Sequence, residues 1–165
     1  MVSKEVEKLL LKVQKPGRYV GGELNEVIKD KKKVDCRFAF CFPDTYEVGM
    51  SHLGMKILYS LMNAVPYIWC ERVFAPWVDM EEEMIKHNIP LYALESGDPV
   101  SDFDFIGFTL QYELSFTNML NMLRLSGVPI KSCDRKELKN IVVAGGPCLS
   151  LIHISEPTRR SYISY

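Results

Sequence analysis

The chain has 165 residues, of which 47% are hydrophobic and 25% charged, and its formal net charge at pH 7 is −1. This is the composition of a globular domain with one hydrophobic core. Its 20 Lys and Arg balance 21 Asp and Glu, which argues against a nucleic-acid or anionic-membrane partner. The start, Met1–Lys15, is charged throughout, and no apolar run reaches membrane-spanning length, so we expect a cytoplasmic protein.

The predicted elements begin with a short amphipathic helix. Apolar residues recur at helical spacing from Val6 to Val13, and Pro16 and Gly17 end the pattern. The next stretch, Arg18–Glu26, contains paired glycines. We expect it to wrap against the sheet rather than form an element of its own.

A first strand is predicted at Cys36–Phe42, followed by a helix over Met50–Met62 and a second strand at Ile68–Ala75. The helix has one predicted apolar face, which consists of Met50, Leu53, Ile57, Leu58, Leu61 and Met62. Pro66 ends this helix before the second strand.

The rest of the chain continues the alternation of helices and strands. A helix over Asp79–Asn88 begins with acidic residues that suit its N-terminal dipole. It precedes a short strand at Pro90–Leu94 and a further strand at Phe105–Leu110. A helix over Glu113–Ser126, stopped by glycine and proline, then leads to a last strand at Ile141–Ala144.

Strands that alternate with helices predict right-handed βαβ units and a parallel sheet covered on both faces. We therefore expect an α/β fold of the Rossmann-like or flavodoxin-like kind, with Cys36–Phe42 as a central strand. Residues 1–34 are predicted to form an N-terminal helix and wrapping segment, and residues 35–148 the α/β domain. Ligands of such folds bind at the carboxyl ends of the strands, so the residues that follow the strands are the candidate site.

Glycines follow two of these strands, at Gly49 and Gly54 and again at Gly145 and Gly146. Glycine lets the backbone approach a ligand closely, and N–H groups at a helix start can hold its anionic parts. We expect these loops to hold a large planar or phosphate-bearing small molecule.

Polar side chains accompany the glycines after the first strand. Asp44, Tyr46 and Glu47 can orient a ligand hydroxyl or cap the helix that follows. His52, next to Ser51, faces a ligand in one interpretation and caps the helix start in the other. The sequence leaves both pairs of alternatives open.

The five cysteines do not have the spacing of a zinc site or of an iron–sulfur cluster loop, so no metal site is predicted in this chain. Cys148 follows a strand end and can face a ligand. An enzyme with Cys148 as nucleophile is a weaker alternative, because the sequence places no histidine beside it.

The segment Leu149–Arg159, LSLIHISEPTR, equals the translation of a transposase sequencing adapter. We therefore set residues 149–165 aside as an artefactual tail. We expect the natural protein to continue beyond Cys148, so that this chain is a fragment.

Several long blocks of the sequence together resemble a known family. They are GRYVGGELNEV (Gly17–Val27), FPDTYEVGMSHLGMKILY (Phe42–Tyr59), ERVFAPWVDME (Glu71–Glu81), FDFIGFTLQYELSFTNMLNML (Phe103–Leu123) and VVAGGPC (Val142–Cys148). The set resembles the N-terminal, cobalamin-binding-like part of an uncharacterised family of radical S-adenosylmethionine (radical SAM) proteins. The resemblance covers nearly all of residues 14–148.

The resemblance implies a downstream barrel with a C-x-x-x-C-x-x-C loop, whose [4Fe-4S] cluster cleaves S-adenosylmethionine. That barrel is not in this chain, so the fragment is not expected to be catalytic by itself. By the same resemblance, Thr109, Gln111 and Tyr112 line the pocket for the nucleotide tail of cobalamin. Gly145, Gly146 and Pro147 resemble the last-strand exit of such domains.

One departure from cobalamin-binding domains concerns the cobalt ligand. Domains that ligate cobalt through histidine have D-x-H-x-x-G, whereas Asp44 and His52 lie eight positions apart here. Cobalamin bound without a histidine ligand and a domain that has lost the cofactor both remain open. Two functions follow: a cofactor- or substrate-binding module of a radical SAM protein, or a non-catalytic module that packs on and covers the barrel.

Overall fold

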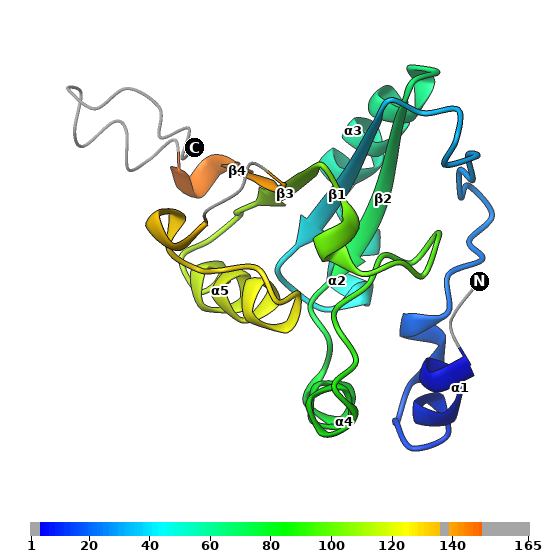
Figure 1. The fold of residues 1–165 in the computed structure, drawn as a ribbon, viewed down its shortest axis with the longest axis vertical. Coiled ribbons are helices and arrows are strands. Elements are labelled where there is room, and N and C mark those ends of the chain that lie inside the picture. Colours follow the sequence, from blue (N-terminus) through cyan, green and yellow to red (C-terminus); the bar gives the residue numbers. More distant parts are fainter. Residues whose placement is uncertain (1–3, 136–138, 150–165) are drawn as a thin grey trace.

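The computed structural model of the protein describes residues 4–135 and 139–149. Its helices and strands are α1 (Lys4–Leu10), β1 (Cys36–Phe42), α2 (Tyr46–Ser51), α3 (Leu53–Ala64), β2 (Ile68–Phe74), α4 (Val78–His87), β3 (Phe105–Thr109), α5 (Ser115–Leu125) and β4 (Ile141–Gly145). Short 3-10 helices lie at Pro16–Tyr19, Val100–Asp102 and Ser132–Asp134. Figure 1 shows the arrangement.

The sheet has four strands in the order β2-β1-β3-β4, and every pair is parallel. This is the start of the flavodoxin-like order. The predicted α/β fold is therefore confirmed, with β1 between β2 and β3. Every helix in the described part of the chain is too short or too polar to cross a lipid bilayer.

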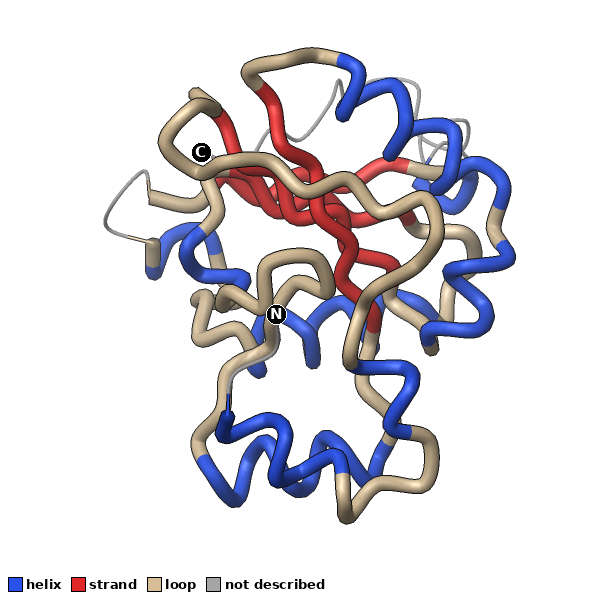
Figure 2. The backbone as a smooth tube through the Cα atoms, turned by 90° about the vertical axis from the view of Figure 1, so that its right-hand side faces the viewer, coloured by secondary structure: helices blue, strands red, loops and turns tan. Residues whose placement is uncertain are grey.

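Helices lie on both sides of the sheet (Figure 2), and each side has its own core. On one side α3 covers β1 and β2, with buried side chains Phe40, Phe42, Met55, Tyr59, Cys70 and Phe74. On the other side α4 and α5 cover β3 and neighbouring strands, with buried side chains Met80, Met84, Ile106, Phe108, Met122 and Leu123. We call these the α3 face and the α5 face of the sheet.

The N-terminal segment packs beside α4 and the loop that follows it. Val6 and Leu9 of α1 are buried in the core of the α5 face. The Tyr92 hydroxyl donates to the Tyr19 carbonyl at 3.1 Å, and Lys12 Nζ lies 2.6 Å from Glu83 Oε2. The segment after α1 thus contacts α4 and the loop that follows it.

The strand predicted at Pro90–Leu94 is wrong, because this segment is a loop with one isolated antiparallel bridge, between Tyr92 and Pro99. The loop turns back at Gly97, which has a φ of +75°. Leu94 N donates to the Arg72 carbonyl of β2 at 3.0 Å. The segment therefore makes a backbone hydrogen bond to the edge of β2 but does not add a strand to the sheet.

The helix predicted over Met50–Met62 is two helices, because the chain is extended at His52 (φ −79°, ψ 112°) between α2 and α3. The predicted apolar face is also wrong: Met55 and Tyr59 face the core, whereas four of its members are exposed. The exposed four are Leu53, Ile57, Leu58 and Leu61. Tyr59 can be buried because its hydroxyl accepts a hydrogen bond from Val27 N at 2.9 Å.

On the α3 face, the ring of Phe38 from β1 covers Gly107 of β3. A Cβ at Gly107 would lie 2.2 Å from Cζ of Phe38. The Phe38 ring lies over this position and stacks on Phe105 at a centroid distance of 6.1 Å. Glycine at position 107 is therefore a requirement of packing.

Candidate functional site

The candidate site lies at the carboxyl edge of the sheet, where β1, β3 and β4 end. Thr109 and Gly145 are register partners on β3 and β4. Leu110 N then donates to the Gly145 carbonyl at 2.7 Å, and Cys148 N donates to the Leu110 carbonyl at 3.3 Å. The parallel sheet thus brings the predicted segments after β3 and β4 together.

Asp44 joins the segment after β1 to this edge. Its Oδ2 accepts a hydrogen bond from the Tyr112 hydroxyl, and its Oδ1 accepts from Thr45 N at 2.6 Å. The hydrogen bond to Asp44, together with desolvation, raises the pKa of Tyr112 to about 12. Tyr112 therefore stays a protonated donor at neutral pH.

Thr109 and Gln111 form a second polar pair beside the first. Gln111 Nε2 donates to Thr109 Oγ1 at 2.6 Å, and both residues are half-buried. The amide oxygen and the hydroxyl proton supply one acceptor and one donor beyond this bond. A ligand with hydroxyl or amide groups matches such a pair.

The four predicted glycines differ in what surrounds them. A Cβ at Gly145 would meet no atom of the described residues within 4 Å, and Gly145 is exposed. A Cβ at Gly146 would lie 2.4 Å from the Leu110 carbonyl oxygen, with φ at +118°. At Gly49 it would lie 2.1 Å from the Phe74 ring, and at Gly54 2.9 Å from the His52 ring. Gly145 leaves free space on its surface, whereas the other three glycines allow close packing within the protein.

His52 and Ser51 are engaged within their own helices. His52 Nδ1 accepts a hydrogen bond from Met55 N at 3.1 Å and so caps α3, and its ring lies 5.3 Å from that of Phe42. Ser51 Oγ donates to the backbone carbonyls of Glu47 and Val48. Capping accounts for the position of His52, and its contact with a ligand stays a prediction.

Tyr46 and Glu47 contact the N-terminal segment. The Tyr46 hydroxyl donates to Glu23 Oε1 at 2.9 Å, whereas Glu47 Oε1 accepts from Arg18 Nε at 2.9 Å. The hydrogen bond from Arg18 lowers the pKa of Glu47 to about 2. Pro147 is exposed and begins a helical turn after β4.

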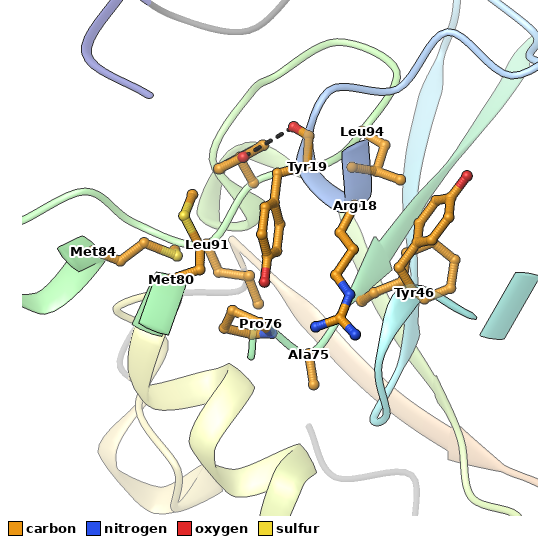
Figure 3. A pocket seen from close by; sticks show the side chains of 11 residues that line it. Arg18, Tyr19, Tyr46, Ala75, Pro76, Met80, Met84, Leu91 and Leu94 are labelled. Carbon is orange, nitrogen blue, oxygen red and sulfur yellow. Dashed lines mark hydrogen bonds between the residues drawn. The ribbon is translucent and has the colours of Figure 1, made fainter. Parts of the chain in front are cut away.

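A small cavity near this edge lies at the end of β2 (Figure 3). It is lined by Tyr19, Tyr46, Met80 and neighbouring side chains, and its volume is about 20 Å³. This is the space of a single water molecule. The cavity is therefore too small for the bulky ligand that the sequence predicts.

Sequence reasoning missed a buried charge network on β2. Arg72 Nε lies 2.6 Å from Glu95 Oε1, and an Arg72 guanidinium nitrogen lies 3.1 Å from Glu23 Oε2. Desolvation raises the pKa of Glu95 to about 7, although Arg72 acts in the opposite direction. The network ties β2 to the N-terminal segment and to the loop after α4.

Glu71 makes the corresponding pair on the α5 face. Arg37 donates to Glu71 Oε1 at 2.6 Å, lies 2.9 Å from Asp98 Oδ2 and stacks over Phe103 at 4.2 Å. The signal in the sequence is the adjacent Glu71 and Arg72 inside an apolar strand, because buried charges need partners. These residues stabilise the fold, and Arg37 lies beside the start of β3 rather than at its carboxyl end.

Cys148 is buried, and desolvation raises the pKa of its thiol. Both properties disfavour a nucleophilic thiolate. Across residues 4–135 and 139–149, no three His, Cys, Asp or Glu side chains gather as a metal site would require.

Residues 54–158 match the family described as "Radical SAM proteins, N-terminal". The chain belongs to this radical SAM N-terminal family. The match includes Thr109–Tyr112 and Gly145–Pro147, and it extends into the tail that we set aside, most of which lies outside the described residues.

A curated relative is "Uncharacterized protein MJ0966" of Methanocaldococcus jannaschii, 27% identical over 111 residues. These residues are 67% of this chain and 19% of the relative, so the chain spans about a fifth of the relative's length. No solved structure matches the chain. The family membership supports the resemblance at the level of a radical SAM N-terminal domain.

Proposed function

We propose that this domain is the cofactor- or substrate-binding module of a radical SAM, iron–sulfur protein, with its ligand at the carboxyl edge of β1, β3 and β4. The observation that carries the proposal is the free space at Gly145, next to Thr109 and its partner Gln111. Asp44 and Tyr112 add a polar pair at the same edge. In open α/β sheets this edge is where ligands bind.

Cobalamin is the ligand that we test first, because it is bulky and has amide and phosphate groups for such an edge. When bound, cobalamin supplies alkyl-transfer or radical chemistry. His52 caps α3 through Nδ1, so our proposal is binding without a protein histidine on cobalt. In this proposal Gly145 admits the ligand, and Thr109, Gln111 and Tyr112 bind its polar groups. The [4Fe-4S] cluster and S-adenosylmethionine would belong to the downstream domain.

The test is cobalamin uptake by the purified chain under anaerobic conditions, followed by visible absorption and co-elution. We expect Gly145→Val to abolish uptake without unfolding the domain, because the new side chain fills the free space. Ala144→Val is the matched control, since position 144 is exposed on the opposite face of the same strand. Normal uptake by Gly145→Val would place the ligand elsewhere.

A second candidate is an interaction module that covers the radical SAM barrel and has no ligand of its own. The observation that favours it is a set of exposed apolar side chains at the N-terminal ends of three helices at the same edge. They are Val48, Trp77, Val78 and Leu114, which are 44%, 47%, 60% and 76% exposed. An exposed apolar patch at one rim is typical of a protein interface.

The two candidates give different results in the uptake experiment. A folded chain that takes up no cobalamin would refute the first candidate. The second then predicts that Trp77 fluorescence is quenched by acrylamide in this chain but protected in a longer polypeptide that includes the barrel. Equal quenching in both would refute the interaction module.

A further inference from the structure

The α3 face of β3 and β4 has apolar side chains that lack a core. By register, Phe105, Ile141 and Val143 share this face, and each is half-buried. None of the three packs against either hydrophobic core of the described residues. On the α5 face of the same sheet, Ile106 and Phe108 are 0% and 3% exposed. Among the described residues, this face of β3 and β4 is thus less covered than the α5 face: Phe38 of β1 stacks on Phe105, whereas Ile141 and Val143 of β4 lie outside both cores.

We call Phe105, Ile141 and Val143 the apolar strip, and α3 lies on the same face of the sheet. Asn63 bonds the backbone of Cys70 on β2 through both its amide groups, at 2.9 and 3.0 Å. Leu58 and Leu61 lie about half a turn around the helix from Asn63. They are 48% and 61% exposed, so these two apolar side chains lie on the side of α3 away from Asn63 and β2.

The strip has the width of one helix. Two neighbouring strands span about 10 Å, and an α-helix with its side chains is about 10–12 Å wide. A helix that lies over β3 and β4 would therefore contact the apolar strip and the side of α3 that carries Leu58 and Leu61 together.

The handedness of the strand connections predicts which strand would precede such a helix. The connection from β1 to β2 runs in one direction along the sheet and places α3 on its face. The connections through α4 and α5 run in the other direction and lie on the opposite face. Because crossovers are right-handed, a helix on the α3 face runs back from a strand that lies beyond β4.

We propose that a helix of the polypeptide downstream of Cys148, following a fifth strand on the outer edge of β4, packs into this strip. β4 is the last strand in the sheet order, so its outer edge can accept that strand. The matched region is 19% of the curated relative, so relatives of this kind have a long further polypeptide to supply the helix. The proposal concerns a different surface from the ligand edge, and either can fail alone.

The test is hydroxyl-radical footprinting of this chain and of the longer polypeptide expressed from the same gene. We expect oxidation of Leu58, Leu61 and Phe105 to fall several-fold in the longer polypeptide, with Leu11 unchanged as the exposed control. Equal oxidation in the two proteins would overturn the proposal. Protection that already appears in this chain as it dimerises, or that appears only with added cobalamin, would also overturn it.

A variant gives a second measurement. Leu58→Lys is expected to lower the unfolding temperature of the longer polypeptide while leaving that of this chain unchanged, because only the longer protein would bury the new charge. Leu53→Lys is the matched control, since Leu53 is 68% exposed and lies on the outward side of α3. Equal effects of Leu58→Lys in the two proteins would contradict the proposal.

Discussion

The two edge strands of the sheet differ in how completely other side chains of the protein pair with or cover their own. At β2, Arg72 and Glu71 are buried, and each meets an opposite charge within about 2.6 Å from another segment. At β4, the side chains are apolar or absent, and Ala144 and Gly145 are exposed. The charges of β2 are paired by described residues, whereas Ala144 and Gly145 at the end of β4 are exposed.

The contrast separates residues that stabilise the fold from the residues near β4 for which we propose a ligand or a packed helix. Burial of a charge is tolerated only with a compensating group, so the β2 network fixes the N-terminal segment and the loop after α4. The free space beside Gly145 at the end of β4 involves no buried charge and so carries no such cost in folding free energy. Substitutions are therefore expected to affect stability at β2 and binding or docking near β4.

The largest effect is expected for Arg72→Leu, which leaves Glu95 buried without its partner. The free energy of unfolding should fall by about 3–5 kcal/mol, measured by urea denaturation at pH 8, because Arg72 lowers the pKa of Glu95 and favours its charged form. Arg124→Leu is the control, because Arg124 pairs with Glu81 at a 58% exposed position and should change stability by less than about 1 kcal/mol. Equal losses would contradict the comparison.

An intermediate effect is expected at the adjacent glycines after β4. Gly146→Ala should lower the free energy of unfolding by about 1–3 kcal/mol, because φ is +118° and the new Cβ meets the Leu110 carbonyl. Gly145→Ala should change it by less than about 0.5 kcal/mol, since its Cβ meets no atom of the described residues within 4 Å. Thermal denaturation of both variants checks this, and a reversed order would show that Gly145 is the residue fixed by packing.

A pH dependence of stability is expected from Glu95. Its folded pKa of about 7 lies above its unfolded value, so the native state holds more protons between them. Stability is therefore fullest at low pH and falls as pH rises from the unfolded pKa through about 7. Glu95→Gln should remove this fall. Glu47 has the opposite pH dependence: its folded pKa of about 2 lies below its unfolded value, so the stability that it contributes is present near neutral pH and is lost as pH falls. Glu47→Gln should remove that loss.

Much of the fold follows from the sequence because its strands and helices alternate clearly. The sheet strands were predicted within a residue or so, and their parallel order brings Asp44, Thr109 and Gly145 to one edge. The apolar face of α3 could not be chosen by spacing alone, because the row with Leu53 and Ile57 and the row with Met55 have the same helical period. The second row meets the sheet in this chain, and the first is exposed.

The site was harder to predict because glycines look alike in a sequence. Gly49 and Gly146 allow contact with Phe74 and Leu110, whereas Gly145 faces free space, and only packing distinguishes them. His52 likewise satisfies the start of α3 with a nitrogen that a metal would otherwise use. The β2 network was missed because Glu23 and Glu95 lie far from Arg72 in the sequence.

The ring of Phe38 above Gly107 links two positions that are distant along the chain. A Cβ at position 107 would overlap the Phe38 ring, 2.2 Å from its Cζ, so the two side chains compete for the same volume. A larger residue at position 107 is compatible with the fold only when position 38 shrinks. Among proteins of this family, these two positions should therefore co-vary in size, with their summed side-chain volume nearly constant.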